Sequence, residues 1–207
     1  SLDGQSTGAD AATLERDREG RALGSLVHAA LERIDFKRPQ PLDKLFASLA
    51  MIAPDPPTEK LVARAKKLVE TFLASPRAAE LAAARIIRRE VEFLLPWPPG
   101  GEQPTQRYFH GFIDSLYQGA DGGWRLLDFK TNRTTAENVA AVANQYELQL
   151  LVYTLAIEQA LGTPLKEATL VLLDGGREHR FNWDEAARMK SLRRIDAAMA
   201  SLLAAPL

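Results

Sequence analysis

The hydrophobic positions in the first third of the chain recur at helical spacing. Apolar residues three and four positions apart form one stripe between residues 23 and 34, which predicts an amphipathic helix ending near Phe36. Two further helices are expected at 42–51 and 58–74, on either side of the breaking segment APDPP. A short helix is expected to begin at Ser75, with Pro76 in its first turn. This part of the chain is therefore predicted to be a helical layer.

After residue 85 the pattern changes to the two-residue alternation of strands. In the segment IIRREVEFLLPW, apolar and charged positions alternate, as in a strand with one buried face. The segment PPGGEQP is expected to end this strand as a loop. Two more strand-like segments, RYFHGFIDSLY and WRLLDFKT, flank QGADGG, whose glycines and aspartate favour a tight connection. These two segments predict a β-hairpin.

The last third of the chain mixes both patterns. A long helix is predicted from 137 to 161 and ends at Gly162, because glycine adopts the left-handed conformation that closes many helices. A strand follows in EATLVLLDG, with a short partner in REHRFNW, and an alanine-rich helix closes the chain. This order of elements predicts an α/β fold, with a small mixed sheet flanked by helices and an N-terminal helical layer.

The composition bounds the class of protein. A chain of 207 residues, 46% of them hydrophobic, can bury one sizeable core, so we expect one domain: a helical layer at 1–84 and a core at 85–207. It contains no cysteine, which excludes disulfides, thiolate zinc sites and iron–sulfur clusters. Neither a signal peptide nor a membrane-spanning run is evident, which predicts a soluble, cytoplasmic protein with no membrane partner.

Two features indicate that the chain works as part of something larger. The polar opening SLDGQSTGAD lacks an initiator methionine, so we expect the chain to be a domain of a longer protein. The formal net charge is −1, and a nucleic-acid binder that acts alone is usually strongly basic. A role in tight, autonomous DNA binding is therefore disfavoured.

The predicted hairpin brings acidic side chains toward each other. Alternate residues of its first strand share one face, namely Tyr108, His110, Phe112 and Asp114. A turn centred near Asp121 would place Asp114 roughly opposite Asp128. Like charges directly opposite each other are destabilising unless a cation lies between them. The pair therefore predicts a divalent metal site, and oxygen ligands favour Mg²⁺ or Mn²⁺.

A basic side chain lies beside this predicted metal site. Asp128 and Lys130 are two residues apart on the second strand, so they share a face. Lys130 could orient an attacking water or stabilise the charge that develops on a phosphate, which suits phosphodiester hydrolysis. A solvated hairpin in which Asp128 simply pairs with Lys130 explains the same residues, and the spacing alone does not decide between the two.

The segments GFIDSLY and LLDFKT, separated by a glycine-rich turn, resemble the core of the PD-(D/E)XK nucleases. The resemblance is to the RecB/AddA branch, in which the nuclease forms the C-terminal domain of a UvrD-like helicase, part of an ATP-dependent exodeoxyribonuclease. Asp114, Asp128 and Lys130 match the D…D-x-K motif of this family. The fold implied is the restriction-endonuclease-like core.

Three further segments resemble the same branch, in the same order along the chain. GSLVHAALE resembles the helix whose histidine is a metal ligand, a role that maps onto His28. REVEFLL resembles the strand that carries an acidic residue, which maps onto Glu90 rather than Glu92. In YELQLLVYTLAIEQ, Gln149 and Tyr153 match a motif that lies near the DNA backbone. Taken alone, this last segment is more typical of a plain amphipathic helix packed on a sheet, and the order of the motifs along the chain reverses that preference.

The resemblance implies a Mg²⁺-dependent exonuclease, with Mn²⁺ as a second metal, that hydrolyses DNA during double-strand-break processing and recombinational repair. The implied metal ligands are His28, Asp114, Asp128 and the carbonyl of Phe129. Lys130 would position the water, Glu90 would support the cluster, and Gln149 with Tyr153 would contact DNA. The implied partners are single strands from an unwound duplex, a helicase motor in the same parent chain, and a partner subunit.

One departure and two alternatives accompany this interpretation. Several relatives bind an iron–sulfur cluster through four cysteines, and this chain has none, so we expect no such cluster. The first alternative is a catalytically inactive nuclease fold that guides DNA or docks a subunit. The second is a purely helical interaction domain, suggested by the helix-rich ends of the chain.

Overall fold

The computed structural model describes residues 6–100 and 107–204. The first five residues of SLDGQSTGAD and the end of the predicted loop PPGGEQP lie outside these ranges. No helix among the described residues is long and apolar enough to cross a membrane. The chain divides into two compact units, the first comprising Ser1–Ala83, Phe129–Arg133 and Leu172–Gly176, and the second comprising Ala84–Asp128, Thr134–Val171 and Arg177–Leu207.

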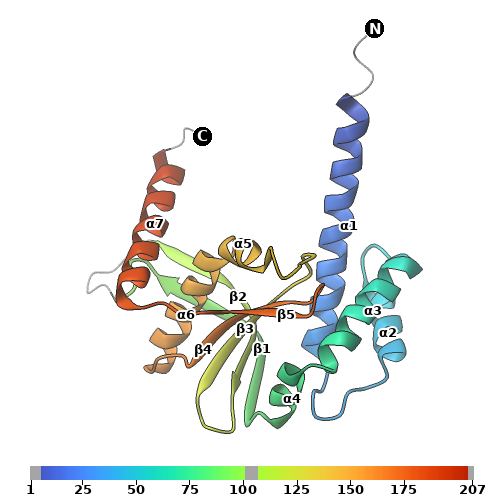
Figure 1. Ribbon diagram of the computed structural model, residues 1–207, viewed down its shortest axis with the longest axis horizontal. Helices are drawn as coiled ribbons and strands as arrows, with labels where there is room; N and C mark the ends of the chain where they lie inside the picture. The colour runs from blue at the N-terminus through green and yellow to red at the C-terminus, as the bar shows by residue number, and fades with distance from the viewer. Residues whose placement is uncertain (1–5, 101–106, 205–207) are drawn as a thin grey trace. The chain divides into compact units, whose positions relative to one another are not determined.

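The first unit is built from the predicted helical layer (Figure 1, blue to green). Its helices are α1 (Ser6–Arg33), α2 (Leu42–Ile52), α3 (Glu59–Leu73) and α4 (Pro76–Ala83). The apolar stripe of α1 is buried as predicted, since every one of its members is at most 8% exposed: Leu23, Leu26, Val27, Ala30, Leu31 and Ile34. Thr58 caps α3 by accepting a hydrogen bond from the Leu61 amide at 3.2 Å, and Pro76 opens α4 as expected.

Aromatic rings fill the core of the first unit. Phe72 on α3 makes edge-to-face contacts with Phe36 and Phe129, at centroid distances of 6.2 and 5.2 Å. Phe129 belongs to the last residues of a strand, so this unit contains the end of that strand together with the helices. Burial of its ring at 3% exposure fixes the backbone that follows Asp128.

The sheet has five strands in the order β1-β2-β3-β4-β5. They are β1 (Ile86–Pro96), β2 (Tyr108–Gln118), β3 (Trp124–Lys130), β4 (Glu167–Leu172) and β5 (Arg177–Phe181). Strands β1, β2 and β3 form an antiparallel meander. Strand β4 runs parallel to β3, because the Lys166 amide bonds the Trp124 carbonyl at the start of both strands and the Leu173 amide bonds the Lys130 carbonyl at their ends. The mixed sheet is confirmed, and the purely helical alternative is wrong.

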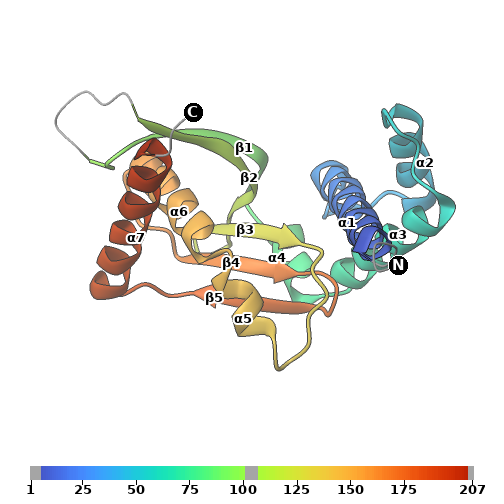
Figure 2. The ribbon, with the colours of Figure 1, turned by 90° about the horizontal axis from the view of Figure 1, so that it is seen from above.

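Three helices belong to the second unit: α5 (Val139–Asn144), α6 (Glu147–Leu161) and α7 (Glu185–Ala204). Figure 2 shows α6 and α7 side by side, next to the ribbon formed by β1 and β2. The prediction of one helix from 137 to 161 is wrong, because the chain turns at Gln145 and Tyr146. Their amides bond carbonyls only three residues back, which tightens the backbone between α5 and α6. Gly162 ends α6 at a φ of +65°, as predicted.

Candidate functional site

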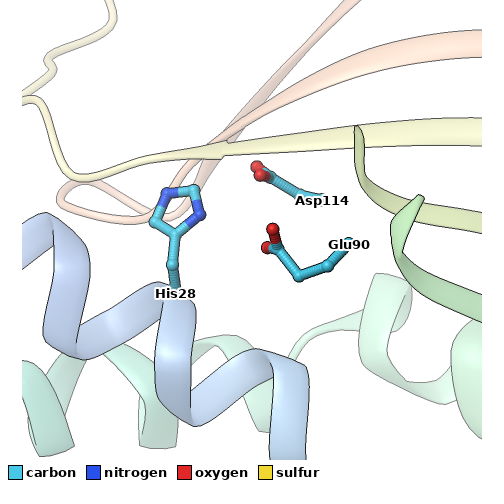
Figure 3. A group of neighbouring side chains, drawn as sticks. All are labelled: His28, Glu90 and Asp114. Atoms are coloured by element: carbon cyan, nitrogen blue, oxygen red, sulfur yellow. The ribbon is translucent and has the colours of Figure 1, made fainter. Parts of the chain in front are cut away.

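Strands β1 and β2 bring two carboxylates together. The ladder pairs Arg89 with Ser115 and Val91 with Ile113, so the position between them sets Glu90 against Asp114. Their carboxylate oxygens lie within 4.8 Å of each other. Figure 3 shows both side chains extending to the same side of the ribbon. Two like charges at this distance repel, and a divalent cation would convert the repulsion into attraction.

The backbone at Glu90 adopts an unusual conformation. Its φ is +47°, the one positive value among the described non-glycine residues. A side chain with a Cβ rarely takes this left-handed conformation, which costs on the order of 1–3 kcal/mol and persists only where surrounding structure enforces it. Such strain is frequent at functional sites. No sequence pattern indicates it, since Glu90 sits in an otherwise regular alternating strand.

Glu92 has a different setting on the same strand. Its carboxylate lies 2.9 Å from the Nε2 atom of His110 on β2, and both side chains are largely exposed. The carboxylate that neighbours Asp114 is that of Glu90. The two candidate acids of REVEFLL therefore differ: one lies in a cluster of acids, the other in a surface contact with a histidine.

Asp128 is buried on β3 and hydrogen-bonded to helix α6. The β2–β3 register pairs Ser115 with Leu127, and its continuation by one pair matches Asp114 with Asp128. The Asp128 side chain is 1% exposed. The Gln149 amide nitrogen donates to Asp128 Oδ1 over a long 3.4 Å and to the Tyr153 hydroxyl at 2.7 Å. The helical spacing of the two α6 residues thus creates a polar chain that ends at a buried carboxylate.

Three predicted site residues belong to the first unit. His28 is half-buried on α1 and is labelled in Figure 3. Phe129 packs its ring on Phe72, and the half-buried Lys130 accepts a hydrogen bond on its carbonyl from Leu173. The division between the units falls directly after Asp128. The roles of His28, Phe129 and Lys130 therefore stay predictions from the resemblance.

The donor set of the second unit suits a hard cation. Carboxylate oxygens are the ligands that Mg²⁺ and Mn²⁺ prefer, and two of them lie close together at Glu90 and Asp114. A cation held there would attract a phosphate oxygen. Asp128 adds a third acid one register step away, and unlike Glu90 and Asp114 it is buried. The arrangement can therefore bind a divalent metal beside a phosphodiester.

The family model of the PD-(D/E)XK nuclease superfamily matches residues 6–205, nearly the whole chain. The chain therefore belongs to the PD-(D/E)XK nuclease superfamily, whose members generally use divalent metals. Its curated relatives are helicase–nuclease subunits of the AddA/RecB type, as the sequence predicted. The antiparallel meander and its flanking helices agree with the fold of this superfamily.

Three relatives are each named as a subunit of an ATP-dependent helicase/nuclease. The protein from Desulforudis audaxviator is 33% identical over 166 residues, covering 75% of this chain and 13% of the relative. The protein from Moorella thermoacetica is 33% identical over 74% of this chain and 11% of its own length, and that from Bacillus mycoides is 28% identical over 78% and 14%. The chain thus spans about one seventh of these relatives or less.

A solved structure described as SSO0001 has a TM-score of 0.39 and 15% identity, over 68% of each chain. This level of likeness supports no inference about the site.

Proposed function

We propose that this chain hydrolyses DNA phosphodiester bonds in a reaction that requires Mg²⁺, with Mn²⁺ able to replace it. The observation that carries the proposal is the acidic cluster on the meander: Glu90 and Asp114 lie within 4.8 Å, and the buried Asp128 follows on the next strand. Membership of a nuclease superfamily supports a role for this cluster in phosphodiester hydrolysis. An exonuclease acting on an unwound single strand is the specific activity proposed.

Asp114, Asp128, His28 and the Phe129 carbonyl would hold the metal, with Glu90 supporting the cluster. Such a donor set, one imidazole nitrogen with several oxygens, would suit Mn²⁺ and Mg²⁺. When bound, the metal would supply Lewis acidity and lower the pKa of a coordinated water. Lys130, two residues after Asp128 on β3, would position that water and stabilise charge on the phosphate.

Gln149 and Tyr153 would contact the DNA strand next to the scissile bond. Their hydrogen bonds support this assignment, because Gln149 joins Tyr153 to the carboxylate of Asp128. A strand that touches the Tyr153 hydroxyl or the Gln149 amide is then held close to the acidic cluster. Such positioning lowers the entropic cost of the reaction by fixing the phosphate before attack.

The relatives extend the proposal to the whole protein. They are named helicase/nuclease subunits, and the chain aligns with a small part of each. We therefore place this nuclease in a longer protein whose helicase motor delivers single strands, together with a partner subunit, for double-strand-break processing and recombinational repair. Delivery by a motor agrees with the net charge of −1, since the chain lacks the positive field that would capture DNA by itself.

The test is cleavage of end-labelled single- and double-stranded DNA with Mg²⁺, Mn²⁺ or EDTA. Asp128→Asn and Lys130→Met should each abolish metal-dependent cleavage. Matched controls remove the same residue types elsewhere: Asp174→Asn, which breaks a contact with Arg64, and Lys67→Met on the exposed face of α3. Both controls should cleave like the wild type.

Survival of cleavage in Asp128→Asn and Lys130→Met would refute the proposed site. Calorimetry with Mn²⁺ separates the remaining possibilities. Metal binding without cleavage, together with cleavage once a helicase partner is added, would establish dependence on the motor. Neither metal binding nor cleavage would instead favour the catalytically inactive module that guides DNA or docks a subunit.

A further inference from the structure

The second unit contains an apolar groove that Gln149 and Tyr153 help to line. Its volume is about 310 Å³, and it lies among β1, β2, α6 and α7. Its lining includes three aromatic residues and two residues of α7: Phe93, Phe109, Tyr153, Ala198 and Met199. Gln149 and His110 add polar atoms to this mainly apolar lining. The groove has the size of a small-molecule site, which typically measures roughly 300–1,000 Å³.

Polar contacts hold α7 in place as one wall of the groove. The Trp97 indole donates to Asp196 at 2.7 Å, and the Glu147 carboxylate accepts hydrogen bonds from Ser191 at 3.0 Å and Arg194 at 2.6 Å. Burial raises the pKa of Glu147, but the hydrogen bonds from Arg194 and Ser191 outweigh burial and lower this pKa below its usual value. The carboxylate is therefore ionised near neutral pH, and the wall is preformed.

The opposite wall depends on a glycine. A Cβ added to Gly111 would lie 3.1 Å from Phe93 Cε1 and 4.0 Å from Tyr153 Cε1. The missing side chain allows the Phe93 ring to lie over β2, edge-to-face with Tyr153 at 5.3 Å between centroids. Two aromatic rings are thus fixed in the lining of the groove.

Tyr153 links the groove to the acidic cluster. Its ring lines the groove, and its hydroxyl accepts the hydrogen bond from Gln149, whose amide also reaches Asp128. A strand with its phosphate at Asp128 would therefore carry a neighbouring base past Tyr153. We propose that this groove takes one unpaired nucleobase of the DNA strand being cleaved, which makes it a substrate subsite of the proposed nuclease.

The chemistry of the groove favours a base over an apolar peptide. Flat aromatic rings stack on any base, which suits a nuclease without sequence preference. The Gln149 amide and the His110 ring offer hydrogen-bonding atoms for base edges. An amphipathic helix of a partner needs a long trough that accepts several turns, whereas this groove holds about 310 Å³. Because a base enters the groove only when it is unpaired, the subsite would select single strands over duplex.

The test fills the groove without touching the proposed catalytic residues. Ala198→Trp places a large ring in the groove, and Ala197→Trp, also exposed on α7 but outside the lining, is the matched control. The probe is single-stranded DNA with 2-aminopurine at one internal position, varied along the strand, with Ca²⁺ in place of Mg²⁺ to limit cleavage. Stacking of the probe on an aromatic ring would quench its fluorescence.

We expect the wild type and Ala197→Trp to quench strongly at one probe position, whereas Ala198→Trp does not. Ala198→Trp should also raise the Kd for single strands about tenfold, the range expected for one stacked base. An abasic nucleotide at the same position should weaken wild-type binding by a similar factor and leave Ala198→Trp unaffected. The wild-type half of this second arm needs no altered protein, so a folding defect cannot imitate it.

Equal quenching and affinity in the two tryptophan variants would overturn the inference, and Mg²⁺-dependent cleavage by the wild type would still support the proposed function. Quenching that is lost in Ala198→Trp, in a protein that cleaves no DNA under any condition, would support the groove and defeat the nuclease proposal. If Ala198→Trp differs from the wild type only in its sedimentation coefficient, with quenching and affinity unchanged, the groove would bind a second copy of the chain. That result would also overturn the inference.

Discussion

The hairpin of β2 and β3 carries acidic residues at both ends, in opposite electrostatic settings. At the turn, Asp121 accepts hydrogen bonds from both Nη atoms of Arg125, at 2.9 and 2.7 Å, and from the Gly123 amide at 3.1 Å, with Lys166 as a further partner. The hydrogen bonds from Arg125 and then Lys166 lower the pKa of Asp121 far below its usual value. At the other end, Asp114 lies within 4.8 Å of a second carboxylate.

Asp121 stabilises the fold, whereas we propose that Asp114 and Glu90 serve the reaction. Asp121 is held among cations, so its charge contributes to the closing of the hairpin. Asp114 faces the like charge of Glu90, whose backbone is also strained. Both features lower the stability of the fold at this end of the hairpin and hold the two carboxylates together. Substitutions at the two ends should therefore have opposite consequences for activity and stability.

The largest effect is expected on activity at the clustered end. Glu90→Gln and Asp114→Asn keep the size of each side chain but remove charge from the proposed metal site. Each should lower the rate of DNA cleavage at least 100-fold, equivalent to roughly 2.7 kcal/mol of transition-state stabilisation. Rates are compared by single-turnover cleavage of end-labelled single strands.

The control for this prediction is Glu92→Gln on the same strand. Glu92 contacts His110 at the surface, so its loss should leave the rate within about twofold, because exposed ion pairs contribute little. Equal losses in Glu90→Gln and Glu92→Gln would show that the strand as a whole is sensitive, and would remove the distinction between the two acids.

The regular parts of the fold were predictable because their patterns are long and local. The stripe of α1 and the alternation in β1 match the observed burial, and the glycine-rich turn placed β2 and β3 correctly. The break between α5 and α6 was missed, because neither glycine nor proline marks Gln145 or Tyr146. At these two residues the amides bond carbonyls three residues back, which interrupts the α-helix although the hydrophobic pattern of the sequence continues.

The residues proposed for the site come from the sequence, and their roles stay predictions, whereas much of the geometry around them could not be predicted. Strand alternation and hairpin symmetry are enough to bring Asp114 toward Asp128. The left-handed backbone of Glu90 and the bond from Gln149 to Asp128 depend on how β1 and α6 pack in three dimensions. The groove beside Tyr153 is assembled from four elements far apart in the sequence, and no local pattern indicates it.

Metal should stabilise the wild type through the same end of the hairpin. A ligand at 100 times its Kd stabilises the folded state by about 2.7 kcal/mol, so Mn²⁺ should raise the melting temperature. Asp114→Asn should show little response to Mn²⁺. Without metal it should melt at the same or a higher temperature than the wild type, since removing one of two facing like charges contributes roughly 0.2–1 kcal/mol. A metal-free Asp114→Asn protein that is clearly less stable would contradict the view that Asp114 serves function over stability.

Gly111→Ala tests the aromatic wall of the groove. The added Cβ would press on the Phe93 ring at 3.1 Å, and overpacking of this kind typically costs about 1–3 kcal/mol. The control is Gly20→Ala in α1, where a Cβ would meet nothing within 4 Å and should stabilise the helix by roughly 0.5–1 kcal/mol. Urea unfolding of both variants gives the free energies. Equal behaviour of the two would mean that the Phe93 ring shifts freely and that the wall is not fixed.

The smallest effect is expected at the turn, and it depends on pH. Because the folded-state pKa of Asp121 is lowered, its stabilising contribution is fully present above the usual value of 3.8 and declines as the pH falls below it. Asp121→Asn should therefore lower the melting temperature at pH 7, and the difference from the wild type should shrink at pH 3. Lys166→Met removes one of the cations at Asp121 and should reproduce part of this pattern. DNA cleavage should be unchanged in both variants, because the turn lies at the far end of the hairpin from Asp114. A difference that is the same at pH 7 and pH 3 would mean that Asp121 acts through the shape of the turn and not through its charge.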